Sequence, residues 1–196
     1  MMRPGPWSRR FVLGLLLCDI LFNFTVGLYW LAHAHELPRL AGSSAIARLY
    51  RDFAPVDHGY FDQVGQAELG LAAMRTTVVQ VLNLSLLAAL LRGWAARVPL
   101  QIAVGAIVAY SVLFNWTCAA VGGFPNMDEG TAASFAIFLG AGAVPLFGHL
   151  YFVLDGWRTA RLAMHAHRPP PAGMAAPLLR RAAMAARPMA AREAAE

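Results

Sequence analysis

Residues 11–31 read FVLGLLLCDILFNFTVGLYWL, an apolar stretch of the length that a helix needs to cross a lipid bilayer. It follows Arg9 and Arg10, and it carries Asp19 and Asn23 at positions i and i+4, so both polar side chains fall on one helix face. The stretch is long for the core of a signal peptide and lacks a clear small-x-small cleavage site. We therefore expect a retained first transmembrane helix whose polar face points into the protein.

Three further apolar stretches of similar length follow at residues 69–91, 98–121 and 131–154. With 58% hydrophobic residues, the chain falls in the composition range of membrane proteins. The predicted fold class is an all-α membrane protein, a four-transmembrane-helix bundle with both termini on one side. The predicted domains are an N-terminus at 1–10, a transmembrane domain at 11–161 and a disordered basic tail at 162–196, which is rich in Pro, Ala and Arg.

The arginines predict the orientation of this bundle. Most of them precede the first span, lie between Arg92 and Arg97, or follow the fourth span, and only three lie in the other two loops. By the positive-inside rule, the N-terminus, the 92–97 hairpin and the tail are cytoplasmic. The exclusive use of Arg over Lys favours a bacterial source. The expected location is therefore a bacterial inner membrane, or the endoplasmic reticulum if the source is eukaryotic.

The first loop, residues 32–68, is too long for a simple turn. Its apolar residues Ile46, Leu49, Tyr50 and Phe53 recur at helical spacing, and Pro55 follows them. The pattern predicts a short amphipathic helix on the membrane surface.

Asp19 and His149 are the first candidates for chemistry. Asp19 lies about 12 Å along the first span from its cytoplasmic end, and His149 lies at a comparable depth in the fourth. Such a pair could exchange protons near neutral pH and run acid–base chemistry on a membrane-soluble substrate. The alternative is that each residue hydrogen-bonds a neighbouring helix and fixes packing only.

The other intramembrane polar residues suggest the lining of a cavity. Arg75 could extend to the headgroups or meet Glu68, while Gln80 and Asn83 lie too deep to reach water and should bond across helices. Pro145 can kink the fourth span and so shape a cavity. The predicted catalytic set is Asp19, His149 and Glu68, and the predicted ligand-binding set is Asn23, Arg75, Gln80, Asn83, Tyr110, Asn115 and Trp116.

Metal, nucleotide and thiol chemistry are not expected. Cys18 and Cys118 should lie toward opposite membrane faces, which disfavours a disulfide. The sequence contains no Walker loop, GxSxG or HExxH motif. We expect no cofactor and no metal; the expected partners are a hydrophobic small molecule and membrane lipids, not nucleic acid, with a homodimer left open.

The segment LYRDFAPVDHGY, residues 49–60, resembles the emopamil-binding-protein branch of the EXPERA family. The likeness covers most of residues 11–161, through Leu90-Leu91-Arg92, Tyr110, Asp128-Glu129-Gly130, and Ala143-Val144-Pro145 to Leu154-Asp155. It implies four helices around a cavity that holds a sterol or a related amphiphile. It also implies double-bond isomerisation, in which acidic residues protonate an alkene and remove a neighbouring proton. The family's second-span acid falls near Met74 or Arg75, with Glu68 the nearest carboxylate.

The sequence leaves three functional hypotheses open. The first is a protein that binds a sterol- or isoprenoid-like ligand in an intramembrane cavity and isomerises it, with Asp19 as the proton carrier. The second is a non-catalytic ligand-binding or assembly protein whose polar residues hold the bundle together. The third is a small proton-coupled transporter that uses Asp19.

Overall fold

The computed structural model describes residues 6–128 and 132–166. Residues 3–160 form one compact unit, and the arrangement given below is that of this unit. Most of the predicted basic tail, at 167–196, lies outside the described residues, as do residues 1–5 and 129–131.

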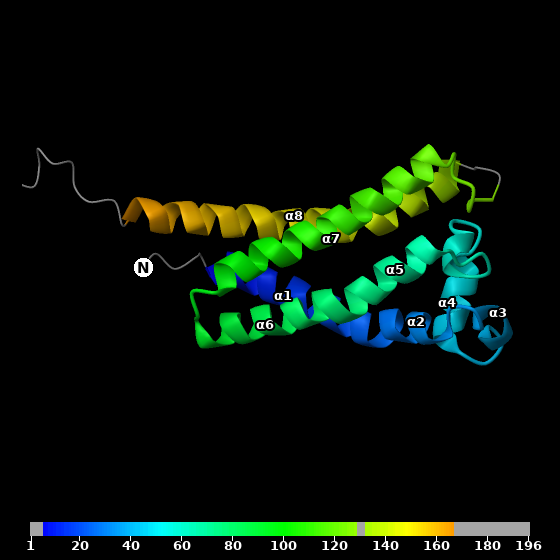
Figure 1. The fold of residues 1–196 in the computed structure, drawn as a ribbon, viewed down its shortest axis with the longest axis horizontal. Coiled ribbons are helices and arrows are strands. Elements are labelled where there is room, and N and C mark those ends of the chain that lie inside the picture. Colours follow the sequence, from blue (N-terminus) through cyan, green and yellow to red (C-terminus); the bar gives the residue numbers. More distant parts are fainter. Residues whose placement is uncertain (1–5, 129–131, 167–196) are drawn as a thin grey trace, which may run out of the picture. The chain divides into compact units, whose positions relative to one another are not determined.

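Four long helices run antiparallel to their neighbours in sequence and give the unit its architecture (Figure 1). All four are long and apolar enough to cross a membrane, and the described residues include no strand, as the sequence predicts. The first two are each divided by a π-helical segment. The first comprises α1 (Pro6–Phe22), η1 (Asn23–Gly27) and α2 (Leu28–His33), the second α5 (Gln66–Met74), η3 (Arg75–Val79) and α6 (Gln80–Arg92), and the others are α7 (Arg97–Val121) and α8 (Ala132–Ala166).

The ends of the helices follow local sequence signals. Gly93 ends α6 in the left-handed region at φ 69°, where glycine carries no steric penalty. The helix α8 continues well past Leu154, where the predicted apolar span ends, and reaches Ala166. The reason is that Ala, Arg, Leu and Met are strong helix formers, so the helix outlasts its membrane-compatible part.

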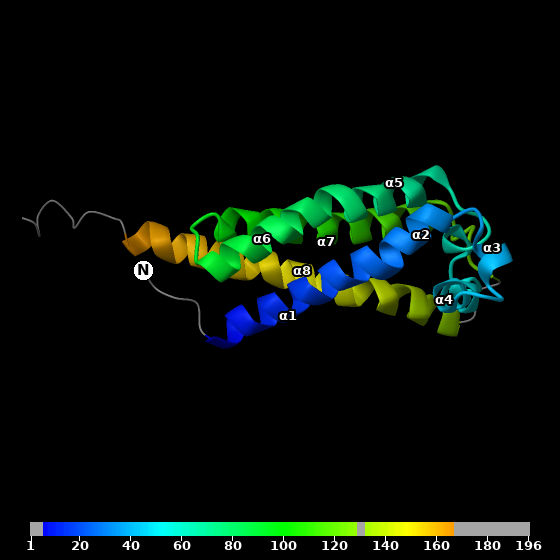
Figure 2. The ribbon, with the colours of Figure 1, turned by 90° about the horizontal axis from the view of Figure 1, so that it is seen from below.

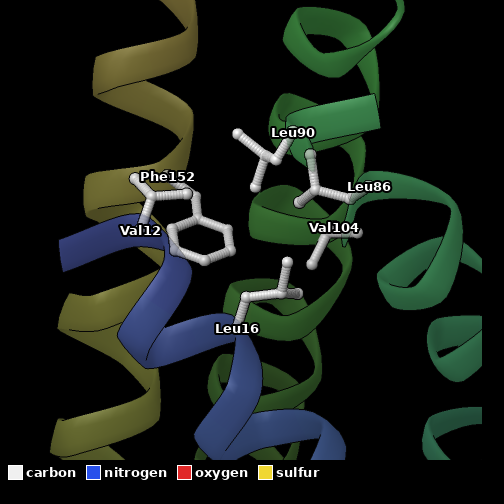
Figure 3. Packing of buried hydrophobic residues seen from close by; sticks show 6 residues of the cluster. All are labelled: Val12, Leu16, Leu86, Leu90, Val104 and Phe152. Atoms are coloured by element: carbon white, nitrogen blue, oxygen red, sulfur yellow. The ribbon is translucent and has the colours of Figure 1, made fainter. Parts of the chain in front are cut away.

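One apolar cluster joins the four long helices at the end that holds the α6–α7 hairpin (Figure 3). It consists of Val12, Leu16, Leu86, Leu90, Val104 and Phe152, all at most 3% exposed. Gly105 allows α7 and α8 to approach closely, because a Cβ there would lie 2.6 Å from the His149 carbonyl oxygen. This end of the unit is therefore filled by side chains.

Three short helices cover the other end: α3 (Leu37–Leu40), α4 (Ala45–Phe53) and η2 (His58–Tyr60). The predicted amphipathic helix is present as α4, which starts at Ser44, whose hydroxyl accepts a hydrogen bond from the Ala47 N–H. It packs against α2 and α3 at this end of the unit (Figures 1 and 2). Trp30 anchors this end, since it is 1% exposed and its indole N–H donates to the Tyr60 carbonyl at 2.8 Å.

Candidate functional site

A cavity of about 430 Å³, called the main cavity below, lies between the four long helices on the side that α4 covers. Every long helix contributes to its wall, and Leu49, Tyr50 and Phe53 of α4 line it as well. The lining is mainly apolar and aromatic: Phe22, Asn23, Val26, Gly27, Trp30, Leu49, Tyr50, Phe53, Asp57, Tyr60, Leu71, Ala72, Arg75, Thr76, Ser111, Val112, Asn115, Trp116, Phe138, Ala141, Gly142 and Pro145. Such a wall with few polar groups is typical of a site for an apolar ligand.

The two π-helical segments, η1 and η3, face each other along the cavity. Gly27 lies against Thr76, and a Cβ added at Gly27 would be 3.3 Å from the Thr76 methyl group. A π-helical turn is wider than an α-helical turn, so it changes the direction of the side chains around it and is frequent at functional sites. Here the two wide turns bring Asn23 and Arg75 to the cavity wall.

Arg75 is the one basic side chain among the described residues of this wall. Its Nε is fully enclosed and has no hydrogen-bond partner. Within the part of the chain that the structure describes, the guanidinium forms no ion pair with a carboxylate, Glu68 included. Its charge nevertheless acts on the nearby phenols of Tyr50 and Tyr60. The pairing with Glu68 that the sequence left open is therefore absent.

A cluster of buried polar side chains lies one turn from the main cavity, on the side of the apolar cluster. The Asn83 amide donates to Asp19 Oδ2 at 2.6 Å and to Gln80 Oε1 at 3.0 Å. Gln80 donates in turn to the Ile20 carbonyl at 3.0 Å. Asn23 donates to the Asp19 carbonyl at 2.9 Å, so Asn23 belongs both to this cluster and to the cavity wall. The Asn83–Asp19 and Gln80–Ile20 bonds join the first and second long helices.

His149 lies close to this cluster without bonding to it. Its Nδ1 is 2.7 Å from the Pro145 carbonyl, which can only accept, so Nδ1 carries the proton. The other nitrogen, Nε2, is buried without a partner, and the side chain is 1% exposed. The Asp19 carboxyl is near enough to act on the imidazole electrostatically, but no hydrogen bond joins the two. Neither Asp19 nor His149 lines the main cavity.

A carboxyl group outside the long helices also reaches the main cavity. Asp57 is 6% exposed, and its Oδ1 accepts from the Gly59 N–H at 3.0 Å. Burial, with a smaller contribution from the negative charge of Glu68, raises the pKa of Asp57 to about 6. Burial likewise raises the pKa of Tyr60 to about 12. Asp57 can therefore hold or release a proton close to neutral pH.

Glu68 lines a smaller neighbouring cavity of about 120 Å³, called the end cavity below. Asp57 and Asn115 belong to the walls of both cavities. Around Gly59, Glu68 Oε1, Asp57 Oδ1 and Asn126 Nδ2 converge on the point where a Cβ would stand. Two carboxyl groups and one amide thus share this end of the site.

A bridge centred on His58 holds the covering loops together. His58 Nδ1 is 2.6 Å from Asp62 and Nε2 is 2.9 Å from Asp128, whose backbone N–H donates to the Pro55 carbonyl. The hydrogen bonds to Asp128 and Asp62 raise the pKa of His58, because a doubly paired imidazolium is favoured. The loop after α4 and the loop after α7 are therefore joined through a histidine.

The residues that the sequence analysis selected fall into separate groups. Asn23, Arg75, Asn115 and Trp116 line the main cavity, Gln80 and Asn83 lie in the polar cluster with Asp19, and Glu68 lines the end cavity. Tyr110 lies instead on the outer face of α7, where it is 65% exposed and its ring contacts Phe114. It does not line the cavity in the described residues.

Five residues that line the main cavity were not predicted as site residues: Asp57, Tyr50, Tyr60, Trp30 and Ser111. The one available signal was the 49–60 segment, which contains three of them. In the described ranges, 6–128 and 132–166, no three His, Cys, Asp or Glu side chains converge as metal ligands.

Comparison with models of known protein families gives no match, and comparison with curated proteins gives none either. The functional assignment therefore depends on the geometry of the main cavity and its polar groups.

Proposed function

We propose that this chain is a multi-pass integral membrane protein that binds a sterol- or isoprenoid-like ligand in the main cavity. Supporting the membrane location, large apolar side chains are exposed on the outer faces of the long helices, among them Leu21, Val81, Val144, Phe147 and Leu154, each more than 60% exposed. A surface of this kind is stable in lipid and would associate in water.

The observation that carries the binding proposal is the main cavity itself. Its volume of about 430 Å³ is in the range of sites for small molecules, and its walls are predominantly apolar and aromatic. Rigid rings such as Phe22 and Trp116 offer flat surfaces to a fused-ring or polyene ligand. The resemblance of residues 49–60 to the EXPERA family is consistent with the same ligand class.

The positive-inside rule predicts which half of the bilayer holds the main cavity. The main cavity is lined by α4 and Asp57, at the end opposite the 92–97 hairpin. With that hairpin in the cytoplasm, the ligand is held in the outer half of the bilayer.

Double-bond isomerisation is a second candidate function, favoured by the buried Asp57 carboxyl. In this reaction Asp57 gives its proton to one alkene carbon, and a base then removes a proton from the carbon next to the cation. The double bond moves by one position, and no atom is lost. Because its pKa is raised to about 6 and it lines the cavity, Asp57 is a better-placed proton donor than Asp19.

Binding is tested by filling the cavity. Ala141 lines it, so Ala141→Phe should displace the ligand, while Ala136→Phe on the same helix adds the same volume at an exposed position outside it. Lipid extracted from each purified variant is identified and counted by mass spectrometry. We expect one apolar molecule per chain in the wild type and in Ala136→Phe, and at least a tenfold loss in Ala141→Phe. Equal occupancy in all three would contradict the proposal.

Isomerisation is tested by solvent exchange. Protein loaded with its extracted lipid is incubated in deuterated water, because each shift of the double bond leaves one deuterium on the carbon that was protonated. Asp57→Asn should abolish the incorporation, while Asp52→Asn, at a 66% exposed side chain on α4, should retain it. Absence of deuterium in the wild type leaves binding as the function and removes catalysis.

A further inference from the structure

Arg75 is the most unusual group in the main cavity. It lies nine residues after Gln66, the first residue of its long helix, or about 13 Å along the helix axis. An arginine at such depth in a membrane helix normally faces a polar partner or an aqueous path.

No carboxylate in the described part of the chain pairs with Arg75. The Nε is enclosed and unpartnered, and the described part of the chain provides no hydrogen bond or ion pair to the guanidinium. Two carboxyl groups lie in the same region but point to other partners: Asp57 accepts from Gly59, and Glu68 lies against Gly59 and Gly65 at the end cavity. Arg75 is half-buried, and a cation held in such a wall without a partner is destabilising, a cost that an anion placed beside it reduces.

We infer, on the basis of the proposed binding function, that the ligand of the main cavity carries a carboxylate and that Arg75 pairs with it. The guanidinium offers two parallel N–H groups that match the two oxygens of a carboxylate. Tyr50 and Tyr60 stand within the electrostatic reach of Arg75, and both line the cavity, so their hydroxyls can donate to the same anion.

The rest of the wall limits the ligand to a single small anionic group. Apart from Arg75, no side chain that lines the main cavity is basic, so a multiply charged headgroup such as a phosphate dianion would remain partly unpaired. The aromatic residues around it, Trp30 and Phe22 among them, suit an apolar skeleton. The ligand class is therefore an acidic lipid, and a cationic amphiphile should be excluded by repulsion from Arg75.

A matched set of probes tests this pairing directly. All-trans retinoic acid, retinol and retinylamine share one ring and one polyene and differ in the terminal group. Their absorption overlaps tryptophan emission, so quenching of Trp30 and Trp116 in the cavity wall reports binding to purified protein in detergent at pH 8. We expect retinoic acid to bind at least tenfold more tightly than retinol, and retinylamine to bind more weakly than both.

Variants of Arg75 separate charge from shape. Arg75→Gln should weaken retinoic acid at least tenfold, to the level of retinol, and change retinol less than threefold. Arg75→Lys should keep part of the preference for the acid. Arg92→Gln is the matched control, because Arg92 lies at the other end of the same long helix and stacks on Trp94 outside the cavity.

The outcomes distinguish this inference from the proposed function. Equal binding of acid and alcohol by the wild type would overturn the carboxylate pairing and leave the binding function standing. Equal loss of both ligands in Arg75→Gln, with an unchanged unfolding temperature, would also overturn it. If no probe binds and Ala141→Phe retains its native lipid, both proposals are wrong. If Arg75→Gln does not fold, the carboxylate pairing is still tested by the ratio of the wild-type affinities for retinoic acid and retinol and by the same ratio in Arg75→Lys.

Discussion

The hydrogen bond between Asn83 and Asp19 should be the strongest single polar contact between the first and second long helices. It is 2.6 Å long and buried, Asn83 is 0% exposed, and its amide also donates to Gln80. Hydrogen bonds between membrane helices contribute about 0.6 kcal/mol on average and up to about 1.7 kcal/mol. A short bond to a carboxyl group belongs at the upper end of that range, so we expect a coupling energy of about 1–2 kcal/mol.

A double-mutant cycle measures that coupling. The free energy of unfolding is determined for the wild type, Asn83→Leu, Asp19→Leu and the double variant, by far-UV circular dichroism during titration with sodium dodecyl sulfate. Each single variant leaves a buried group without its partner, and the double variant removes both, so the double variant should cost less than the sum of the singles. Ser85→Ala is the control, because the exposed Ser85 hydroxyl bonds only within its own helix. Additivity within about 0.3 kcal/mol would show that the bond is absent and refute the reasoning.

Three further predictions concern packing, pH and a helix end. Gly105→Ala should destabilise the protein by about 1–3 kcal/mol in the same titration, because the new Cβ meets the backbone of α8, whereas Gly140→Ala, with nothing within 4 Å, should cost nothing measurable. Thermal unfolding should occur at lower temperature as pH rises, since Asp57 and His58 both have raised pKa values in the folded state. The contribution of Asp57 to the free energy of unfolding is present below pH 4 and is lost as pH rises toward about 6. The contribution of His58 to the same free energy is lost above about pH 6.5. Asp57→Asn should remove the fall in unfolding temperature between about pH 4 and 6, and His58→Gln should remove the fall above about pH 6.5. An unchanged pH dependence in either variant would contradict the role given to that residue. Gly93→Ala should cost about 1 kcal/mol of unfolding free energy, because the position has φ 69°.

The long helices could be predicted from the sequence because the length of an apolar run is a local property. The same holds for α4, whose apolar residues recur at helical spacing and whose first turn follows Ser44. The exact ends of the helices were harder to predict from the sequence. Hydropathy shows where an apolar span ends, whereas helix propensity determines where the helix itself ends. The helix α8 shows the difference at Leu154.

Only part of the site could be predicted from the sequence. Depth placed Asp19 and His149 near each other, but periodicity could not show that Asp19 bonds Asn83 and that His149 bonds Pro145. The π-helical segments have no sequence signature that we recognised, and they decide that Arg75 reaches the cavity. Asp57 was missed because its burial depends on a loop that folds against residues far away in the sequence, where the His58 N–H donates to the Asn126 carbonyl.

The proposed occupant of the main cavity is an acidic apolar molecule. An experimental density map of the protein, purified in mild detergent from its own membrane, tests this most directly. We expect one elongated feature between Trp30 and Trp116, with its end within hydrogen-bond distance of the Arg75 guanidinium. A cavity closed by its own side chains, or a carboxylate of the chain itself paired with Arg75, would contradict the account.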